Sequence, residues 1–262
     1  MIDIQNQKDT REIPLEKAGV RGLAYPVTVL DKRNKVQHTT AVADLFVSLP
    51  HNFKGTHMSR FIEIFHKYRS DLSLRKFLGM LSEIREKLDA ERAFGTLTFP
   101  FFIEKEAPVS GQRGMMSYEC TYEGEVRRGI PDESGFFVSV TVPVTTLCPC
   151  SRAISDRGAH NQRGRVKARL KYTSFFWIED IIALVEDCAS SGVYSVLKRE
   201  DEKFVTERAY DRPVFVEDLV REVYLALAGR GFSRFSVEAE NFESIHNHNA
   251  YAYAEYVAPE EG

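Results

Sequence analysis

The most constraining feature of the chain is an order of predicted elements that occurs twice. Each half reads strand, strand, helices, strand, strand. Alternating apolar residues predict strands at 22–30, 36–49, 95–105 and 115–126 in the first half, and at 135–145, 163–172, 234–242 and 249–256 in the second. Apolar residues at helical spacing predict helices after Ser59 and at 74–88, and again at 177–188 and 213–228, where Pro213 suits a first turn. The sequence therefore predicts a tandem repeat of one α+β unit.

Such a unit is an antiparallel sheet with its helices on one face. The residues around Gly129 and Pro131 mark the predicted seam. We therefore expect an N-terminal extension at 1–20, a first module at 21–130 and a second module at 131–262. Two such modules leave sheet edges open, which favours side-by-side assembly into a barrel or ring.

Composition excludes several classes of function. The net charge is −3 over 262 residues, so no basic field points to a nucleic-acid partner. No apolar run approaches the length that spans a membrane, and the polar N-terminal sequence predicts no signal peptide. With 4 cysteines we expect reduced thiols and a cytoplasmic protein.

Two of the cysteines, Cys148 and Cys150, flank a single proline at the end of a predicted strand. A redox pair of the thioredoxin type needs two intervening residues, so that chemistry is not expected. A metal ligand or a nucleophile remains open. So does the simpler interpretation of two partly buried cysteines in a tight turn.

His160 follows in a polar loop that gives an imidazole no apolar reason to be there. A thiolate and an imidazole are two ligands for a borderline-soft metal, and a catalytic site needs a third and an open position. The acidic residues within 198–203 are the best local source of a carboxylate. That run is equally typical of a solvated charged loop.

Two further polar clusters call for an explanation. His246 and His248 would face the same side of an extended backbone, as metal ligands, as a general acid and base, or as two exposed histidines. Lys54 and Arg60 flank a predicted helix start, which suits a phosphate but is also typical of an ordinary capped helix.

Several segments, taken together, resemble the type IB GTP cyclohydrolases, the prokaryotic folate-pathway family. The residues that carry the resemblance are Thr-Thr-Leu-Cys-Pro-Cys-Ser at 145–151, Gly-Ala-His-Asn-Gln-Arg at 158–163, and the segments 54–61, 197–203, 215–218 and 243–248. They occur in the family's order and cover the chain from Ile13 onward. One departure is Arg152-Ala153, where the family has Lys-Glu, so a role for that acidic side chain is in doubt.

The resemblance implies a tunnelling fold of tandem ββααββ modules, assembled as a homotetramer with active sites between subunits. It implies conversion of GTP and water to 7,8-dihydroneopterin triphosphate and formate, without an organic cofactor. One divalent metal, Zn, Mn or Fe, would be held by Cys148, His160 and Glu202.

The resemblance also implies roles for the remaining polar residues. The catalytic groups would be Cys150, His246, His248 and Glu243. Glu217 would accept hydrogen bonds from the guanine base. The candidates for the triphosphate are Arg163, Arg60, Lys54 and His57.

Two alternatives stay open at the level of sequence. One is a tunnelling-fold nitrile reductase that attacks a deazaguanine through a cysteine, in which Glu217 would have the same role. The other is a non-catalytic, metal-stabilised assembly protein.

Overall fold

A computed structural model describes residues 9–130 and 135–259 of the chain. The chain divides into two compact units. The first comprises the described residues of Met1–Pro100 and Cys120–Val138, and the second those of Phe101–Glu119 and Ser139–Gly262. The module boundaries at 20/21 and 130/131 stay predictions, and each unit is described by itself.

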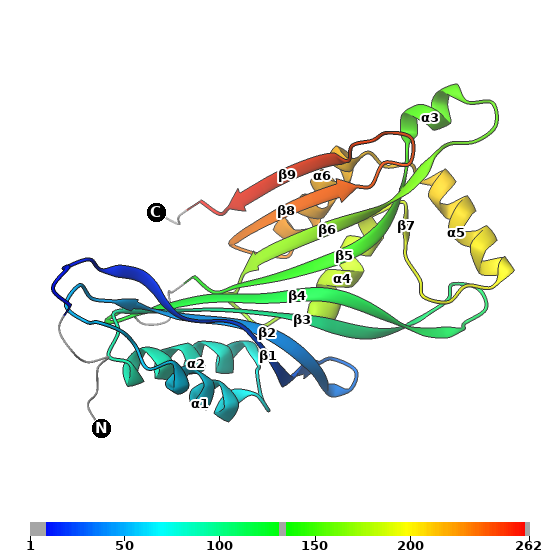
Figure 1. Cartoon of the computed structure of the whole chain (residues 1–262). Helices are drawn as coiled ribbons and strands as arrows, with labels where there is room; N and C mark the ends of the chain where they lie inside the picture. Colours follow the sequence, from blue (N-terminus) through cyan, green and yellow to red (C-terminus); the bar gives the residue numbers. More distant parts are fainter. Residues whose placement is uncertain (1–8, 131–134, 260–262) are drawn as a thin grey trace. The chain divides into compact units, whose positions relative to one another are not determined.

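The first unit has the predicted order of two strands, two helices and two strands. Its elements are β1 (Leu15–Asp31), β2 (Lys35–Leu49), α1 (Met58–Tyr68), α2 (Leu74–Lys87), β3 (Arg92–Glu106) up to Pro100 and β4 (Arg113–Arg127) from Cys120. The other ends of β3 and β4 belong to the second unit. The strands lie in the order β1-β2-β3-β4, and β2 pairs antiparallel with both β1 and β3. Both helices lie along one face of these strands (Figure 1).

Close packing of α2 on the sheet depends on a glycine of β3. A Cβ on Gly95 would stand 2.6 Å from Leu81 Cδ2 and 3.1 Å from the Phe77 ring. Phe77, Leu81 and Ile84 are completely buried, as their helical spacing in the sequence predicts.

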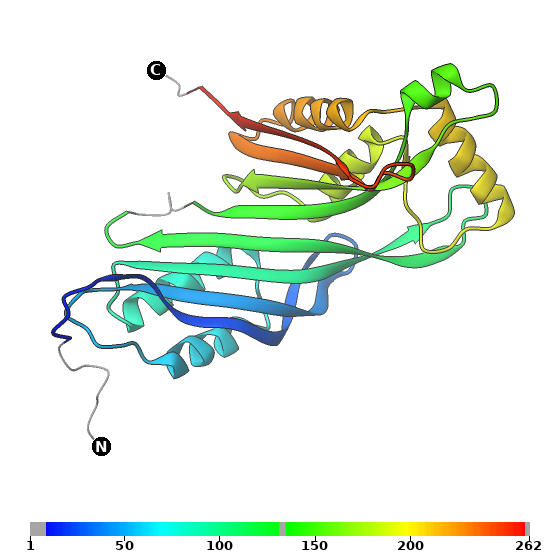
Figure 2. The same ribbon diagram turned by 45° about the horizontal axis from the view of Figure 1, so that its top comes forward.

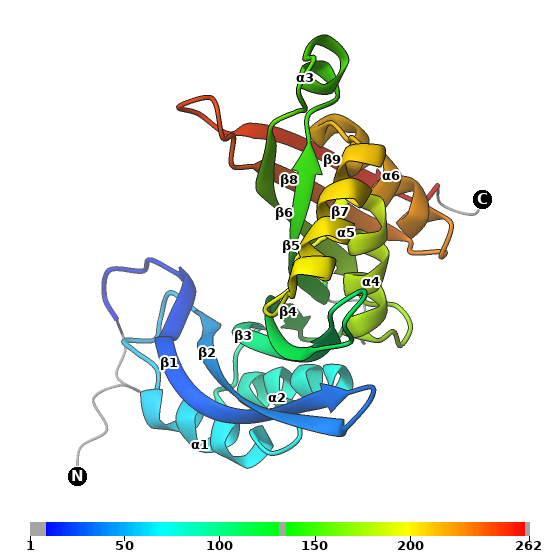
Figure 3. The same cartoon turned by 90° about the vertical axis from the view of Figure 1, so that its right-hand side faces the viewer.

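The second unit is richer in helices than the first. Its elements are β5 (Phe137–Leu147), α3 (Pro149–Ile154), β6 (Asn161–Lys171), α4 (Ile178–Cys188), β7 (Ser191–Gly192), α5 (Arg199–Asp211), α6 (Val216–Ala228), β8 (Arg234–Asn241) and β9 (Ala250–Val257). The main strands lie in the order β5-β6-β8-β9, and the short β7 pairs with β5. Helix α6 packs on β8 and β9. Helices α4 and α6 share one face of this sheet, as Figures 2 and 3 show.

The α+β class and the antiparallel pairing of the strands are confirmed within each unit. A barrel built from several copies stays a prediction.

Several boundaries differ from those predicted. Strand β1 begins at Leu15, so residues 15–20 of the predicted extension belong to the sheet, where Leu15 pairs with Leu49. Helix α1 begins after His57 rather than Ser59. Helix α6 begins at Val216, because the Val214 N–H bonds to the Leu147 carbonyl and keeps that segment extended.

Two predicted irregular segments are helical. The turn expected at the cysteine pair is the short helix α3, and the charged run at 198–203 leads into α5. Within residues 9–130 and 135–259, no helix is both long and apolar enough to cross a bilayer. No disulfide joins any of the four cysteines, all of which lie in the described part of the chain.

Candidate functional site

A cavity of about 310 Å³ opens in the second unit, where α6 begins and β8 ends. Ligand pockets typically start at about this size. Six of the twelve predicted site residues line it, from segments far apart in the sequence: Cys148, His160, Glu217, Glu243, His246 and His248. We call this space the Cys148 cavity.

Hydrogen bonds join the Cys148 and His160 segments directly. Cys148 is the N-cap of α3, and its Sγ accepts from the Ser151 N–H at 3.4 Å. The Cys148 N–H donates to the His160 carbonyl at 3.1 Å, and the His160 N–H donates to Ser151 Oγ at 3.2 Å. The short helix therefore holds thiol and imidazole at the same cavity.

A buried glutamine orients the imidazole. Gln162 Nε2 donates to Thr146 Oγ1 at 2.9 Å, which turns Oε1 toward His160 Nδ1, 3.1 Å away. Oε1 can only accept, so Nδ1 carries the proton and Nε2 keeps a free lone pair. That tautomer is the one that a metal ligand needs.

Glu217 lies in the first turn of α6, as predicted, and lines the cavity with an exposed side chain. A carboxylate at this position can accept two parallel hydrogen bonds from a planar donor edge.

The loop between β8 and β9 brings both predicted histidines to the cavity. His246 and His248 are stacked, with ring centroids 5.1 Å apart and an angle of 16° between the rings. They face the same side, as predicted, but their backbone is a loop rather than a strand. Ser244 Oγ of this loop lies 3.4 Å from His160 Nδ1.

Three predicted site residues of this unit do not line the Cys148 cavity: Cys150, Glu202 and Arg163. All three are exposed. Cys150 is in the first turn of α3, and Glu202 is in the first turn of α5.

The start of α5 is anchored by Asp201, beside Glu202. Asp201 is completely buried and accepts hydrogen bonds from the N–H groups of Val109, Ser110 and Lys198, each at 2.8 Å. The Ser110 hydroxyl donates to it at 2.6 Å. Burial acts to raise the pKa of Asp201, but these hydrogen bonds outweigh it and hold the pKa well below its usual range.

The metal set of Cys148, His160 and Glu202 stays a prediction. Among the described residues, no three Cys, His, Asp or Glu side chains are grouped closely enough to hold a metal ion. Cys148 and the free Nε2 of His160 do fit two positions of a borderline-soft cation. The third ligand stays a prediction.

The remaining phosphate candidates belong to the first unit. Lys54, His57 and Arg60 lie just before and within the first turn of α1. The Arg60 guanidinium donates to the Lys87 carbonyl at 3.0 Å. Their predicted role is not tested by these positions.

Sequence reasoning missed two polar residues of the cavity, Gln162 and Asn241. Both are polar but nearly fully buried, at 7% and 2% exposed. The sequence did contain an indication of both. Each is a polar residue at a position of its strand where the alternation of the sequence predicts a buried, apolar one.

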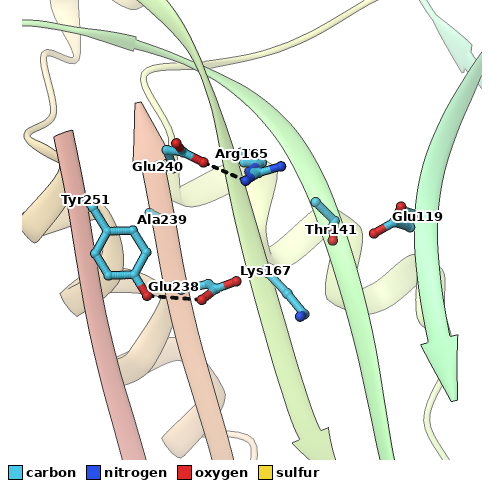
Figure 4. A pocket seen from close by; sticks show the side chains of 8 residues that line it. All are labelled: Glu119, Thr141, Arg165, Lys167, Glu238, Ala239, Glu240 and Tyr251. Carbon is cyan, nitrogen blue, oxygen red and sulfur yellow. Dashed lines mark hydrogen bonds and ion pairs between the residues drawn. The ribbon is translucent and has the colours of Figure 1, made fainter. Parts of the chain in front are cut away.

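A second cavity of about 280 Å³ lies on the sheet face that points away from α4 and α6 (Figure 4). Its charged groups are largely paired. Arg165 lies 2.7 Å from Glu240, and the Tyr251 hydroxyl donates to Glu238 at 3.1 Å. Asn249 also donates to Glu240, and this bond and Arg165 keep the pKa of Glu240 below its ordinary value.

Comparison with known proteins identifies the family. The model of the family described as type I GTP cyclohydrolase folE2 matches residues 1–252. The chain is 54% identical to GTP cyclohydrolase FolE2 of Geobacter sulfurreducens over 256 residues, which is 97% of this chain and 98% of that protein. It is also 54% identical to GTP cyclohydrolase FolE2 of Syntrophus aciditrophicus, with 97% and 99% covered.

A solved structure supports the fold alone. A hyperthermostable mutant of urate oxidase from Bacillus sp. TB-90 superposes with a TM-score of 0.51 at 9% identity, covering 91% of this chain and 96% of that chain. Sequence relationship decides between the predicted alternatives, and it favours the cyclohydrolase over the nitrile reductase and the assembly protein. The chain belongs to the type I GTP cyclohydrolase FolE2 family.

Proposed function

We propose that this chain converts GTP and water to 7,8-dihydroneopterin triphosphate and formate, as a type IB GTP cyclohydrolase. The observation that carries the proposal is the convergence of Cys148, His160, Glu217 and the loop of both histidines on one cavity. These groups come from four separate segments. Such convergence of nucleophile-activating, base-binding and proton-transferring groups is what an active site requires.

Glu217 would hold the substrate by its base. Its carboxylate would accept from guanine N1–H and from one hydrogen of the 2-amino group. This bidentate bond would fix the ring plane and present the imidazole ring of the base to the Cys148 side of the cavity.

Cys148 and His160 would hold one divalent cation, Zn, Mn or Fe, with Glu202 as the third ligand. When bound, the cation would make a water molecule a usable nucleophile at neutral pH. Because Glu202 does not group with the other two in one chain, we infer that a second copy supplies it. This fits a homotetramer with sites at subunit interfaces.

The stacked histidines would handle the protons of the reaction. Ring opening between C8 and a ring nitrogen needs a proton on the departing nitrogen, and His246 or His248 can donate it. Hydrolysis of the resulting formamide releases formate. Opening of the ribose, rearrangement and ring closure need further transfers, which Glu243 and the Cys150 thiol would share with the histidines.

The remaining roles follow from the substrate. The triphosphate requires cations, and Arg163, Arg60, Lys54 and His57 are the proposed contacts, some of them from neighbouring copies. The product would feed tetrahydrofolate and queuosine precursor synthesis. A cytoplasmic location is part of the proposal.

The proposal is tested by substituting one cavity cysteine and one cysteine elsewhere. Metal-reconstituted wild-type protein is incubated with GTP, and formate and the oxidised, fluorescent pterin are measured. Cys148→Ala is expected to lose bound metal and turnover while keeping its fold and oligomeric state. Cys188→Ala removes a buried thiol outside the cavity and is expected to retain turnover. If Cys148→Ala instead unfolds or dissociates the assembly, the role of the metal is structural and the proposal fails.

A further inference from the structure

Asn241, at the Cys148 cavity, carries an amide oxygen that lacks a hydrogen-bond partner in the described part of the chain. The residue ends β8, lines the cavity and is 2% exposed. Its Oδ1 is buried and has no hydrogen-bond partner among the residues that the structure describes. Buried side-chain acceptors are nearly always paired, so this one lacks a donor that another molecule can supply.

The backbone opposite leaves room for this amide. Asn241 pairs with Gly164 of β6, and a Cβ on Gly164 would stand 2.5 Å from Asn241 Oδ1. Any larger residue at 164 would push the amide away. The glycine and the asparagine thus form one feature, which keeps a polar atom where an apolar side chain would pack with less penalty.

The cavity's other polar groups indicate which donor is missing. Gln162, the other nearly buried amide of the cavity, has both ends engaged by Thr146 and His160. Asn241 Oδ1 is thus a buried acceptor of the cavity lining that still lacks a donor among the described residues. A nucleotide's phosphates and ribose stay nearer to solvent and cations. The base edge is the part that reaches such depth.

The donor edge of guanine has one hydrogen more than a carboxylate can take. Glu217, in the proposed function on which this inference rests, accepts N1–H and one hydrogen of the 2-amino group. The second amino hydrogen remains. We propose that Asn241 Oδ1 accepts this second hydrogen, so that Asn241 selects guanine over hypoxanthine, which has no 2-amino group.

The test compares GTP with inosine triphosphate in the metal-reconstituted enzyme. The KM for GTP is measured by formate release, and inosine triphosphate is titrated as a competitor to give its inhibition constant. Asn241→Leu is expected to raise the KM for GTP about tenfold, the size of one lost hydrogen bond, and to leave the inhibition constant almost unchanged. The ligand-free variant is expected to melt at the same or a higher temperature, because it no longer buries an unpaired acceptor.

Two further variants sharpen the result. Asn249→Leu makes the same chemical change outside the cavity, at a residue bonded to Glu240. It is expected to leave the ratio of the inosine triphosphate inhibition constant to the KM for GTP at its wild-type value. Gly164→Ala displaces the Asn241 amide without removing it and is expected to reduce the ratio as Asn241→Leu does.

The outcomes separate this inference from the proposed function. If Asn241→Leu weakens GTP and inosine triphosphate equally, or lowers the melting temperature and leaves the ratio unchanged, Asn241 has a structural role and the assignment is wrong. A wild-type enzyme that releases no formate from GTP overturns the proposed function itself, and the assignment with it.

Discussion

Gln162 Oε1 lies 3.1 Å from Nδ1 of His160, and the other end of the same amide donates to the buried Thr146 hydroxyl. In this orientation the amide oxygen accepts from Nδ1 of His160. The proton is then on Nδ1, and Nε2 is left free at the cavity. If His160 binds the proposed metal, Gln162 orients its imidazole from behind.

Gln162→Leu is expected to lower metal affinity about 10- to 100-fold, because partners behind a ligating histidine contribute on this scale. The measurement is a metal titration in competition with a chelator, with circular dichroism to show that the fold is kept. The control is Gln112→Leu, at an exposed position directly before β4. Unchanged affinity in Gln162→Leu would mean that His160 needs no orientation or is not a ligand.

Asp201→Asn is expected to lower the melting temperature at pH 7, because an amide cannot accept from all four donors that the carboxylate serves. The native pKa of Asp201 is depressed, so its charge stabilises the fold above the unfolded-state pKa of about 3.9 and this contribution is lost as pH falls below it. The difference between wild type and variant should therefore be constant from pH 7 to 5 and shrink below about pH 4.

The control for this experiment is Asp211→Asn, at the exposed end of the same helix, which should have no such pH dependence. A difference between wild type and Asp201→Asn that grows as the pH falls would contradict the account.

Lys105 and Glu186 form an ion pair within the second unit, 2.7 Å apart, with side chains 16% and 15% exposed. Tyr118 donates to the same carboxylate at 3.0 Å, and burial raises the pKa of that hydroxyl. Lys105→Met should destabilise the fold by about 3 kcal/mol in urea unfolding, since it leaves Glu186 without its cation. Adding Glu186→Gln should recover part of that loss. An effect of Glu186→Gln that is the same in the wild type and in the Lys105→Met background would show that the pair is not coupled.

Subunit mixing tests where Glu202 acts. Cys148→Ala and Glu202→Gln chains should each bind no metal in the predicted site. If the carboxylate comes from a second copy, unfolding and refolding a one-to-one mixture restores the ligand set in about a quarter of the sites, as random pairing of copies requires. Recovery of metal and formate release at that level is expected. No recovery at all would show that the three ligands come from one chain.

Sequence patterns predicted the strands and helices with buried faces, because apolar periodicity reports burial directly. Helix α5 was not predicted, because only Asp201 and Ala209 of its residues are buried and its sequence is almost uniformly polar. Its acidic first turn, which complements the helix dipole, was the available signal.

The residues of the candidate site also divide into those that the sequence predicted and those that it did not. Residue types and the family resemblance predicted Cys148, His160 and Glu217, which the cavity brings together. Gln162 and Asn241 were missed because their importance depends on a neighbour across the strand, Thr146 or Gly164, that sequence spacing does not reveal.

The most direct test of the central claim is formate release from GTP by metal-reconstituted protein, wild type against Glu217→Gln. The account predicts one formate per pterin from the wild type. It predicts a large rise in KM in the variant, because the amide presents an N–H to the base edge that the carboxylate would accept from. Release of formate by Glu217→Gln with an unchanged KM would show that the Cys148 cavity is not where the guanine base binds.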